Sequence, residues 1–156
     1  MAIHLVRHAK AGSRPDWAQP DELRPLTEAG RVQADALAGK LLPFPLQRIL
    51  TSRYVRCVQT VEPLAAAAGL PVEQVPELAE EADLEQTWAL LERLAADGWE
   101  AVVCSHGNVI GPLLDRLHRR GVHLDADEWS CKKGSIWRVE IEDGAFARAV
   151  LAVAQA

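Results

Sequence analysis

The chain has few cysteines and lacks several features that would place it in a specialised class of protein. Cys57, Cys104 and Cys131 are an odd number and contain no Cys-x-x-Cys pair, which favours reduced thiols over a disulfide framework. No apolar run is long enough to cross a bilayer, and the N-terminus has no charged segment followed by an apolar one. We therefore expect a soluble, cytoplasmic protein with no membrane partner.

The sequence also has no internal repeat, low-complexity tract, linker-like stretch or long basic block. Its 17 basic and 22 acidic residues give a net charge of −5, which argues against nucleic acid as the main partner. With 156 residues, of which 49% are apolar, the chain can bury a sizeable core. We expect residues 1–156 to form a single domain.

Apolar periodicity predicts strands that alternate with helices. Valines dominate residues 101–105, which are typical of a buried strand, and Asp143-Gly144 favours a tight turn between two C-terminal strands. Other strands are expected at residues 2–6, 48–52 and 70–75, and helices after Thr27 and at residues 53–69, 84–97 and 109–120. The alternation predicts an α/β fold of three helix-sheet-helix layers, with a mostly parallel central sheet and an antiparallel edge.

Helix ends and faces are also predicted. Thr27, Asp83 and Asn108 are candidate N-caps, each directly before an expected helix. Pro63 is expected to kink or break the helix at residues 53–69. The core-facing stripe of the first helix is expected to consist of Val32, Ala36, Leu37 and Leu41.

Polar side chains follow three of the predicted strands at the points where the strands end. The first strand leads into Arg7-His8, the second through Ser52 to Arg56, and the valine strand into Ser105-His106-Gly107. Ligands of α/β sheets bind beyond the carboxyl ends of the strands, so these groups are expected to meet in one crevice. Two arginines and two histidines predict a site for an anion, and a phosphoryl group fits it best.

Three segments resemble motifs of the histidine phosphatase superfamily, whose members have the phosphoglycerate mutase-like fold. LVRHA resembles the RHG signature, SRYVRCVQT the S-x-x-x-R-x-x-Q-T segment, and VVCSHGNVI the segment of the second histidine. They occur in the order found in the family. The chain is most similar to short bacterial members of the phosphohistidine phosphatase type, and to the phosphatase domain that some bacteria fuse to a nudix hydrolase.

The resemblance implies a role for individual residues. His8 corresponds to the nucleophile, and Arg7, Arg56 and His106 to the phosphate pocket. Leu78-Ala79-Glu80 matches the L-x-E stretch that supplies the acid in the family, with Glu81 as the second candidate. Further possible substrate contacts are Lys10, Arg14, Arg53, Glu81, Gly107 and Lys133.

Two departures from the family pattern bear on the substrate. Ala9 replaces the glycine of RHG, and KAGSR after it lacks the E-x-x-x-N pattern of the mutases, which disfavours sugar phosphates. The resemblance implies hydrolysis of a phosphorylated small molecule or phosphoprotein through a phosphohistidine, with no metal or other cofactor. A binding module for a phospho-ligand or phosphoprotein is the alternative. A mutase is disfavoured because a short chain has little to spare for a lid.

Overall fold

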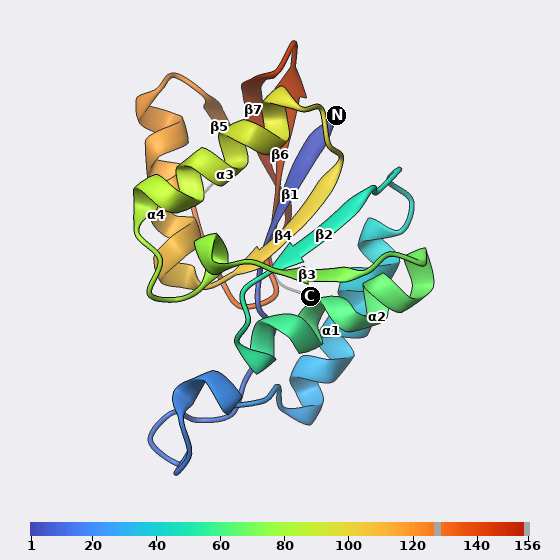
Figure 1. The fold of residues 1–156 in the computed structure, drawn as a ribbon, viewed down its shortest axis with the longest axis vertical. Coiled ribbons are helices and arrows are strands. Elements are labelled where there is room, and N and C mark those ends of the chain that lie inside the picture. The colour runs from blue at the N-terminus through green and yellow to red at the C-terminus, as the bar shows by residue number, and fades with distance from the viewer. Residues whose placement is uncertain (127–128, 155–156) are drawn as a thin grey trace.

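The computed structural model describes residues 1–126 and 129–154, and Figure 1 shows its elements in chain order. The strands are β1 (Ala2–Arg7), β2 (Arg48–Thr51), β3 (Val72–Gln74), β4 (Ala101–Ser105), β5 (His123–Asp125), β6 (Ile136–Glu142) and β7 (Ala145–Val153). The α-helices are α1 (Glu28–Leu41), α2 (Val55–Ala68), α3 (Leu84–Ala96) and α4 (Gly107–Arg119), and the short 3-10 helices are η1 (Asp21–Leu23) and η2 (Pro76–Leu78).

The strands form one mixed sheet in the order β3-β2-β4-β1-β6-β7-β5. β3, β2, β4 and β1 are parallel, β6 is antiparallel to β1, and β7 is antiparallel to β6. The α/β fold with a parallel centre is therefore confirmed. The C-terminal hairpin is not the edge, however, because the short strand β5, which the sequence analysis missed, pairs in parallel with β7.

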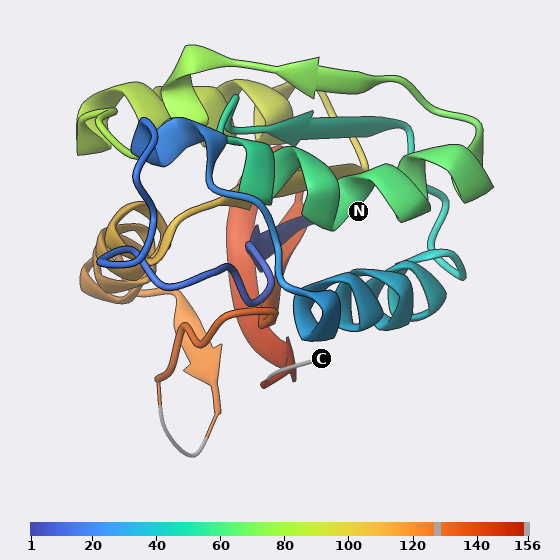
Figure 2. The same ribbon diagram turned by 90° about the horizontal axis from the view of Figure 1, so that it is seen from below.

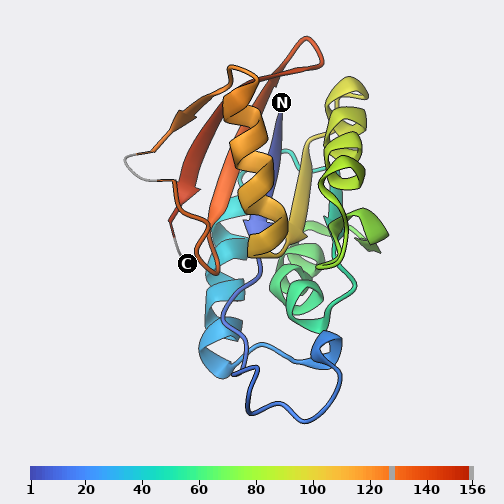
Figure 3. The same ribbon diagram turned by 90° about the vertical axis from the view of Figure 1, so that its left-hand side faces the viewer.

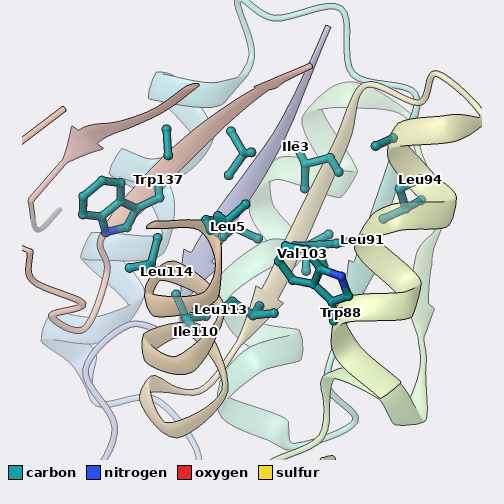
Figure 4. Packing of buried hydrophobic residues seen from close by; sticks show 14 of the residues in the cluster. Ile3, Leu5, Trp88, Leu91, Leu94, Val103, Ile110, Leu113, Leu114 and Trp137 are labelled. Atoms are coloured by element: carbon teal, nitrogen blue, oxygen red, sulfur yellow. The ribbon is translucent and has the colours of Figure 1, made fainter. Parts of the chain in front are cut away.

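Helices cover both faces of the sheet, and side chains of each strand alternate between the two faces. Ile3 and Leu5 of β1 pack with α3 and α4, and Figure 4 shows this core. Val6, the next residue of β1, packs on the opposite face of the sheet with residues of α1 and α2. Figure 3 shows α3 and α4 in front of the strands, with α1 and α2 behind.

The predicted inner stripe of α1 is partly wrong. Thr27 caps the helix as expected, since its side chain accepts a hydrogen bond from the Gly30 N–H. Val32, however, is 66% exposed, and Ala36 is exposed as well. The buried face consists of Gly30, Ala34, Leu37, Ala38 and Leu41. Small residues face inward because a Cβ at Gly30 would lie 2.0 Å from the carbonyl oxygen of Lys10, so the helix lies too close for a larger side chain.

Other local predictions have mixed outcomes. Asp83 forms a capping box with Gln86 at the start of α3, as its position predicted. Pro63 does not break α2, which continues to Ala68 and ends at the left-handed Gly69. Asp143 and Gly144 both have positive φ, of 52° and 76°, as a tight hairpin turn requires. No helix of the described residues is long and apolar enough to span a membrane.

Candidate active site

The carboxyl ends of β1, β4 and β2 lie level with one another. Arg7 at the end of β1 is paired with Ser105 of β4, and Thr51 of β2 with Cys104 of β4. Seen from below (Figure 2), the segment that joins β1 to α1 and contains η1 lies in front of these strand ends. A cavity of about 420 Å³ opens there, lined by Arg7, His8, Ala11, Gly12, Ser13, Arg14, Arg24, Arg56, Glu80, His106, Gly107, Asn108 and Lys133.

His8 is 5% exposed and has a defined tautomer. Its Nδ1 lies 2.8 Å from the carbonyl oxygen of Ala9, which can only accept, so Nδ1 carries the proton and Nε2 keeps its lone pair. Burial lowers the pKa of His8 to about 3, against the effect of that hydrogen bond, and the charges of His106, Arg56 and Arg7 lower it further. The imidazole is therefore neutral near pH 7, with an unprotonated nitrogen available for attack.

His106 is the N-cap residue of α4, and its ring is oriented by the second motif. Its Nε2 lies 2.9 Å from the hydroxyl of Ser52, which accepts a hydrogen bond from the Tyr54 N–H and is free to donate to the ring. Nε2 also lies 3.6 Å from Cys57 Sγ, so both contacts of the ring are made through this nitrogen, whereas Nδ1 is buried and has no partner among the described residues. The ring centroids of His8 and His106 are 5.5 Å apart.

Arg7 lies against the start of α4, in close contact with Gly107. Its Nη1 donates to the carbonyl oxygen of Cys131 at 2.6 Å, while its Nε is buried with no partner among the described residues. A Cβ at Gly107 would lie 2.9 Å from the Arg7 Cζ. Gly107, expected as a substrate contact, lines the cavity and leaves the space that the Arg7 guanidinium occupies.

Arg56 is 1% exposed and is bound by a residue that the sequence analysis missed. Its Nη1 donates to the Asp21 carbonyl oxygen at 3.0 Å, and its Nη2 to the Asp21 carboxylate at 3.0 Å. Asp21 also accepts from the Nε of the buried Arg24. Although partial burial opposes the effect, the hydrogen bond from Arg24 and the charge of Arg56 lower the pKa of Asp21. Asp21 is therefore a carboxylate that fixes two arginines.

Glu80 lies at the cavity, as the L-x-E resemblance implied. Its carboxylate accepts from Arg56 Nη2 at 3.2 Å and from Arg14 Nη2 at 3.1 Å. Asn108 was expected to cap α4, but the helix begins at Gly107, two residues earlier than expected, and His106 is its N-cap. The Asn108 side chain donates instead to the Glu80 carbonyl oxygen at 2.8 Å, because the L-x-E segment passes beside the helix start and offers an acceptor there.

The remaining candidates are divided between the cavity and its surroundings. Arg14 and Lys133 line the cavity, whereas Lys10, Arg53 and Glu81 do not. Arg53 forms ion pairs with Glu22 and Glu81. Glu81 also accepts from the Tyr54 hydroxyl, and burial together with this bond raises the pKa of Tyr54 to about 12.

The last two residues of the second motif hold the first motif and its loop in place. Thr60 Oγ1 accepts from the Ala9 N–H at 3.0 Å and donates to the Arg56 carbonyl oxygen at 2.6 Å. Gln59 accepts from the Leu26 N–H at 2.8 Å. The two segments, far apart in sequence, are thus joined directly behind His8 and Arg56.

Together these groups offer an anion several donors and one nucleophile. Arg7 Nε and Arg56 Nε are buried N–H groups and His106 Nδ1 is a buried ring nitrogen. None of the three has a partner among the described residues, and all three side chains line the cavity. A buried donor without an acceptor costs about 1–3 kcal/mol. The oxygens of a tetrahedral anion can satisfy such donors while His8 Nε2 faces its central atom.

Comparison with known proteins agrees with the motifs. The family model of the histidine phosphatase superfamily (branch 1) matches residues 3–87. An 8-oxo-(d)GTP phosphatase of Mycolicibacterium smegmatis is 34% identical over 145 residues, which cover 91% of this chain but only 45% of that protein. The phosphohistidine phosphatase SixA of Escherichia coli is 32% identical over 124 residues, which cover 75% of this chain and 74% of SixA.

Solved structures agree as well. The protein histidine phosphatase SixA in complex with tungstate has a TM-score of 0.76 and 26% identity, and the alignment covers 97% of each chain. YhfR of Bacillus stearothermophilus has a TM-score of 0.77 at 16% identity, a likeness of fold alone. The predictions of a phosphoglycerate mutase-like fold and of a phosphatase are confirmed at the level of the family. The chain therefore belongs to the histidine phosphatase superfamily.

Proposed function

We propose that this chain hydrolyses a phosphoryl group through a covalent phosphohistidine at His8. Nε2 of His8 attacks the phosphorus in line with the leaving oxygen, and water then attacks the phosphohistidine and releases phosphate. Arg7, Arg56 and His106 bind the phosphoryl oxygens. Their fixed N–H groups stabilise the charge of the transition state, so the proposed chemistry needs no metal ion.

The single observation that carries the proposal is the pairing of a neutral nucleophile with unsatisfied donors. The hydrogen bond to Ala9 leaves the lone pair of His8 on Nε2. Arg7 Nε, Arg56 Nε and His106 Nδ1 are buried around the same cavity without hydrogen-bond partners among the described residues. A site that only bound a phospho-ligand would need the donors but not the oriented imidazole.

Glu80 is the candidate proton donor to the leaving oxygen. It lies at the cavity wall, where its carboxylate is bound by Arg14 and Arg56. Its Oε1 accepts from Arg14 Nη2 at 3.1 Å and its Oε2 from Arg56 Nη2 at 3.2 Å, so both carboxylate oxygens already have arginine partners. A phosphate leaving group departs as a stable anion and needs no proton from Glu80.

The relatives offer two classes of substrate. One is named for an oxidised guanine nucleotide and the other for phosphohistidine. The chain spans less than half of the first of these proteins, so the substrate of that protein can only be proposed for this chain. We further propose a cytoplasmic protein without nucleic acid or membrane partners, supported by the free thiols of Cys57, Cys104 and Cys131 and the net charge of −5.

The test is hydrolysis of phenyl phosphate in the presence of a chelator. Wild type is expected to release phenol, and His8→Asn, which retains a donor toward Ala9, is expected to release none. Release of phenol at the wild-type rate by His8→Asn would refute the proposed nucleophile. Tight phosphate binding without turnover of any phosphate ester or phosphohistidine peptide would identify a binding module.

A further inference from the structure

Only some of the positive charges in the cavity are balanced by carboxylates. Five cationic side chains line it, against the single carboxylate of Glu80. Those with carboxylate partners are Arg14, Arg24 and Arg56, which pair with Asp21, Glu80 or both. Among residues 1–126 and 129–154, Arg7 has no carboxylate partner, and Lys133 forms neither a hydrogen bond nor an ion pair.

Lys133 belongs to a turn that is fixed to the end of β1. The Gly134 N–H lies 3.2 Å from the Arg7 carbonyl oxygen and 3.1 Å from that of His8. In return, the Arg7 N–H donates to the Ser135 carbonyl oxygen at 3.1 Å. Gly134 has a φ of +79°, which suits glycine and reverses the chain at this point. The backbone of Lys133 is therefore held beside the first motif.

The surroundings of Lys133 are cationic. Partial burial, followed by the charges of Arg7 and Arg24, lowers the pKa of Lys133, and the charges of Lys10 and Arg56 act in the same direction. Like charges held together without a counter-ion are unfavourable unless a ligand brings negative charge. The structure thus keeps an unpaired ammonium group next to the phosphoryl pocket.

One phosphoryl group does not balance this charge. The cationic side chains of the lining outnumber Glu80 and the adjoining Asp21 by three. A phosphate monoester near neutral pH brings about −1.5 to −2 charges. Once Arg7 and Arg56 bind the transferred phosphoryl group, Lys133 still lacks a partner, so a second anionic group of the substrate has a place beside it.

Two features indicate the kind of leaving group. Apart from His8 and His106, no aromatic side chain of the described residues lines the cavity, so nothing there stacks on a ring next to the phosphoryl group. Both carboxylate oxygens of Glu80 already accept from Arg14 and Arg56, so a leaving group that departs as an anion suits the site better than one that needs a proton from Glu80. A second phosphate meets both conditions, since it is bound by charge and departs as an anion.

We infer that the site acts on diphosphates, with the terminal phosphoryl group against His8 and the penultimate phosphate on Lys133. This inference rests on the proposed function. The bond from His8 Nε2 to the terminal phosphorus forms as the bond from that phosphorus to the bridging oxygen breaks. The bridging oxygen keeps the electron pair and leaves as part of a monophosphate. Water then attacks the phosphohistidine, the electron pair of the N–P bond returns to Nε2, and inorganic phosphate and a proton are released.

The test compares adenosine diphosphate with phenyl phosphate, which carries one phosphoryl group and no second anion. Wild type is expected to have the higher kcat/KM on adenosine diphosphate. Lys133→Ala is expected to lower kcat/KM on adenosine diphosphate by about tenfold or more, the scale of one charge-assisted hydrogen bond, and on phenyl phosphate by less than about twofold. Lys132→Ala, at the neighbouring lysine of the same turn, which does not line the cavity, is the matched control and is expected to leave both substrates unaffected.

Three results would overturn the inference. An equal loss on both substrates in Lys133→Ala would mean that Lys133 binds the transferred phosphoryl group itself. A kcat/KM on phenyl phosphate above that on adenosine diphosphate would remove the basis for a second phosphate. Turnover of a phosphohistidine peptide but not of adenosine diphosphate would assign the unpaired charge to a protein substrate. Failure of the proposed function is distinguishable, since turnover would then be absent on every substrate or persist in His8→Asn.

Discussion

The Gly107→Ala variant tests whether the position of Arg7 controls the rate of catalysis independently of the stability of the fold. The added Cβ would lie 2.9 Å from the Arg7 Cζ and 3.1 Å from its Nε and Nη1. Carbon atoms in contact prefer about 3.5–4.0 Å, so the guanidinium must move by about 0.6–1 Å. Arg7 is held by its 2.6 Å hydrogen bond to Cys131, so the shift strains this bond and displaces the guanidinium from its position in the phosphoryl pocket. A misplacement of about 1 Å in an active site costs about 100-fold in rate.

The assay measures kcat on phenyl phosphate together with Tm. Gly107→Ala is expected to lower kcat by about 100-fold, with a free energy of unfolding within about 1 kcal/mol of wild type, because alanine favours a helix more than glycine does. Gly111→Ala, in the same helix but with no atom within 4 Å of the added Cβ, is the matched control and is expected to keep full activity. A Gly107→Ala variant with wild-type kcat would refute the assigned position of Arg7.

Three further predictions concern His8, Asp21 and Glu80. The pKa of His8 falls from about 6.5 in the unfolded chain to about 3 in the fold, so stability is present above pH 6.5 and lost as the pH falls toward 3. Between pH 7 and pH 5, the free energy of unfolding measured in urea should therefore fall by about 2 kcal/mol more for wild type than for His8→Asn. Equal losses of stability in the two proteins would contradict the burial of a neutral imidazole. Asp21→Asn removes a carboxylate that orients Arg56 and should lower kcat by about tenfold without raising KM, whereas a raised KM at constant kcat would assign Asp21 to substrate binding. Glu80→Gln should slow hydrolysis of phenyl phosphate by about tenfold or more but that of 4-nitrophenyl phosphate, with its better leaving group, much less, and equal effects would remove Glu80 as the proton donor.

The residues at strand ends were predictable because one topological rule places them. Arg7, His8 and His106 follow parallel neighbouring strands in register, so their meeting follows from the strand order. Arg56 is the second residue of α2, which begins shortly after β2, and the spacing of the second motif located it. Asp143-Gly144 was equally predictable, because a two-residue hairpin turn needs positive φ at both positions.

Asp21 and Arg24 were missed because they belong to the segment before α1, where no periodicity shows which side chains face the site. The only signal was a pair of opposite charges three positions apart between Pro20 and Pro25. The inner face of α1 was misassigned for a related reason. Apolar size predicted Val32 as a core residue, whereas close approach of the chain at Lys10 selected Gly30 and small neighbours.

The most direct test is to identify the phosphorylated atom in enzyme quenched during turnover. Because Nδ1 of His8 donates to the Ala9 carbonyl oxygen, only Nε2 is free to attack. Mass spectrometry and phosphorus NMR are expected to find an acid-labile, base-stable phosphoryl group on Nε2 of His8. A phosphoryl group on Nδ1 of His8 or on any other residue, or rapid turnover with none trapped, would contradict the account.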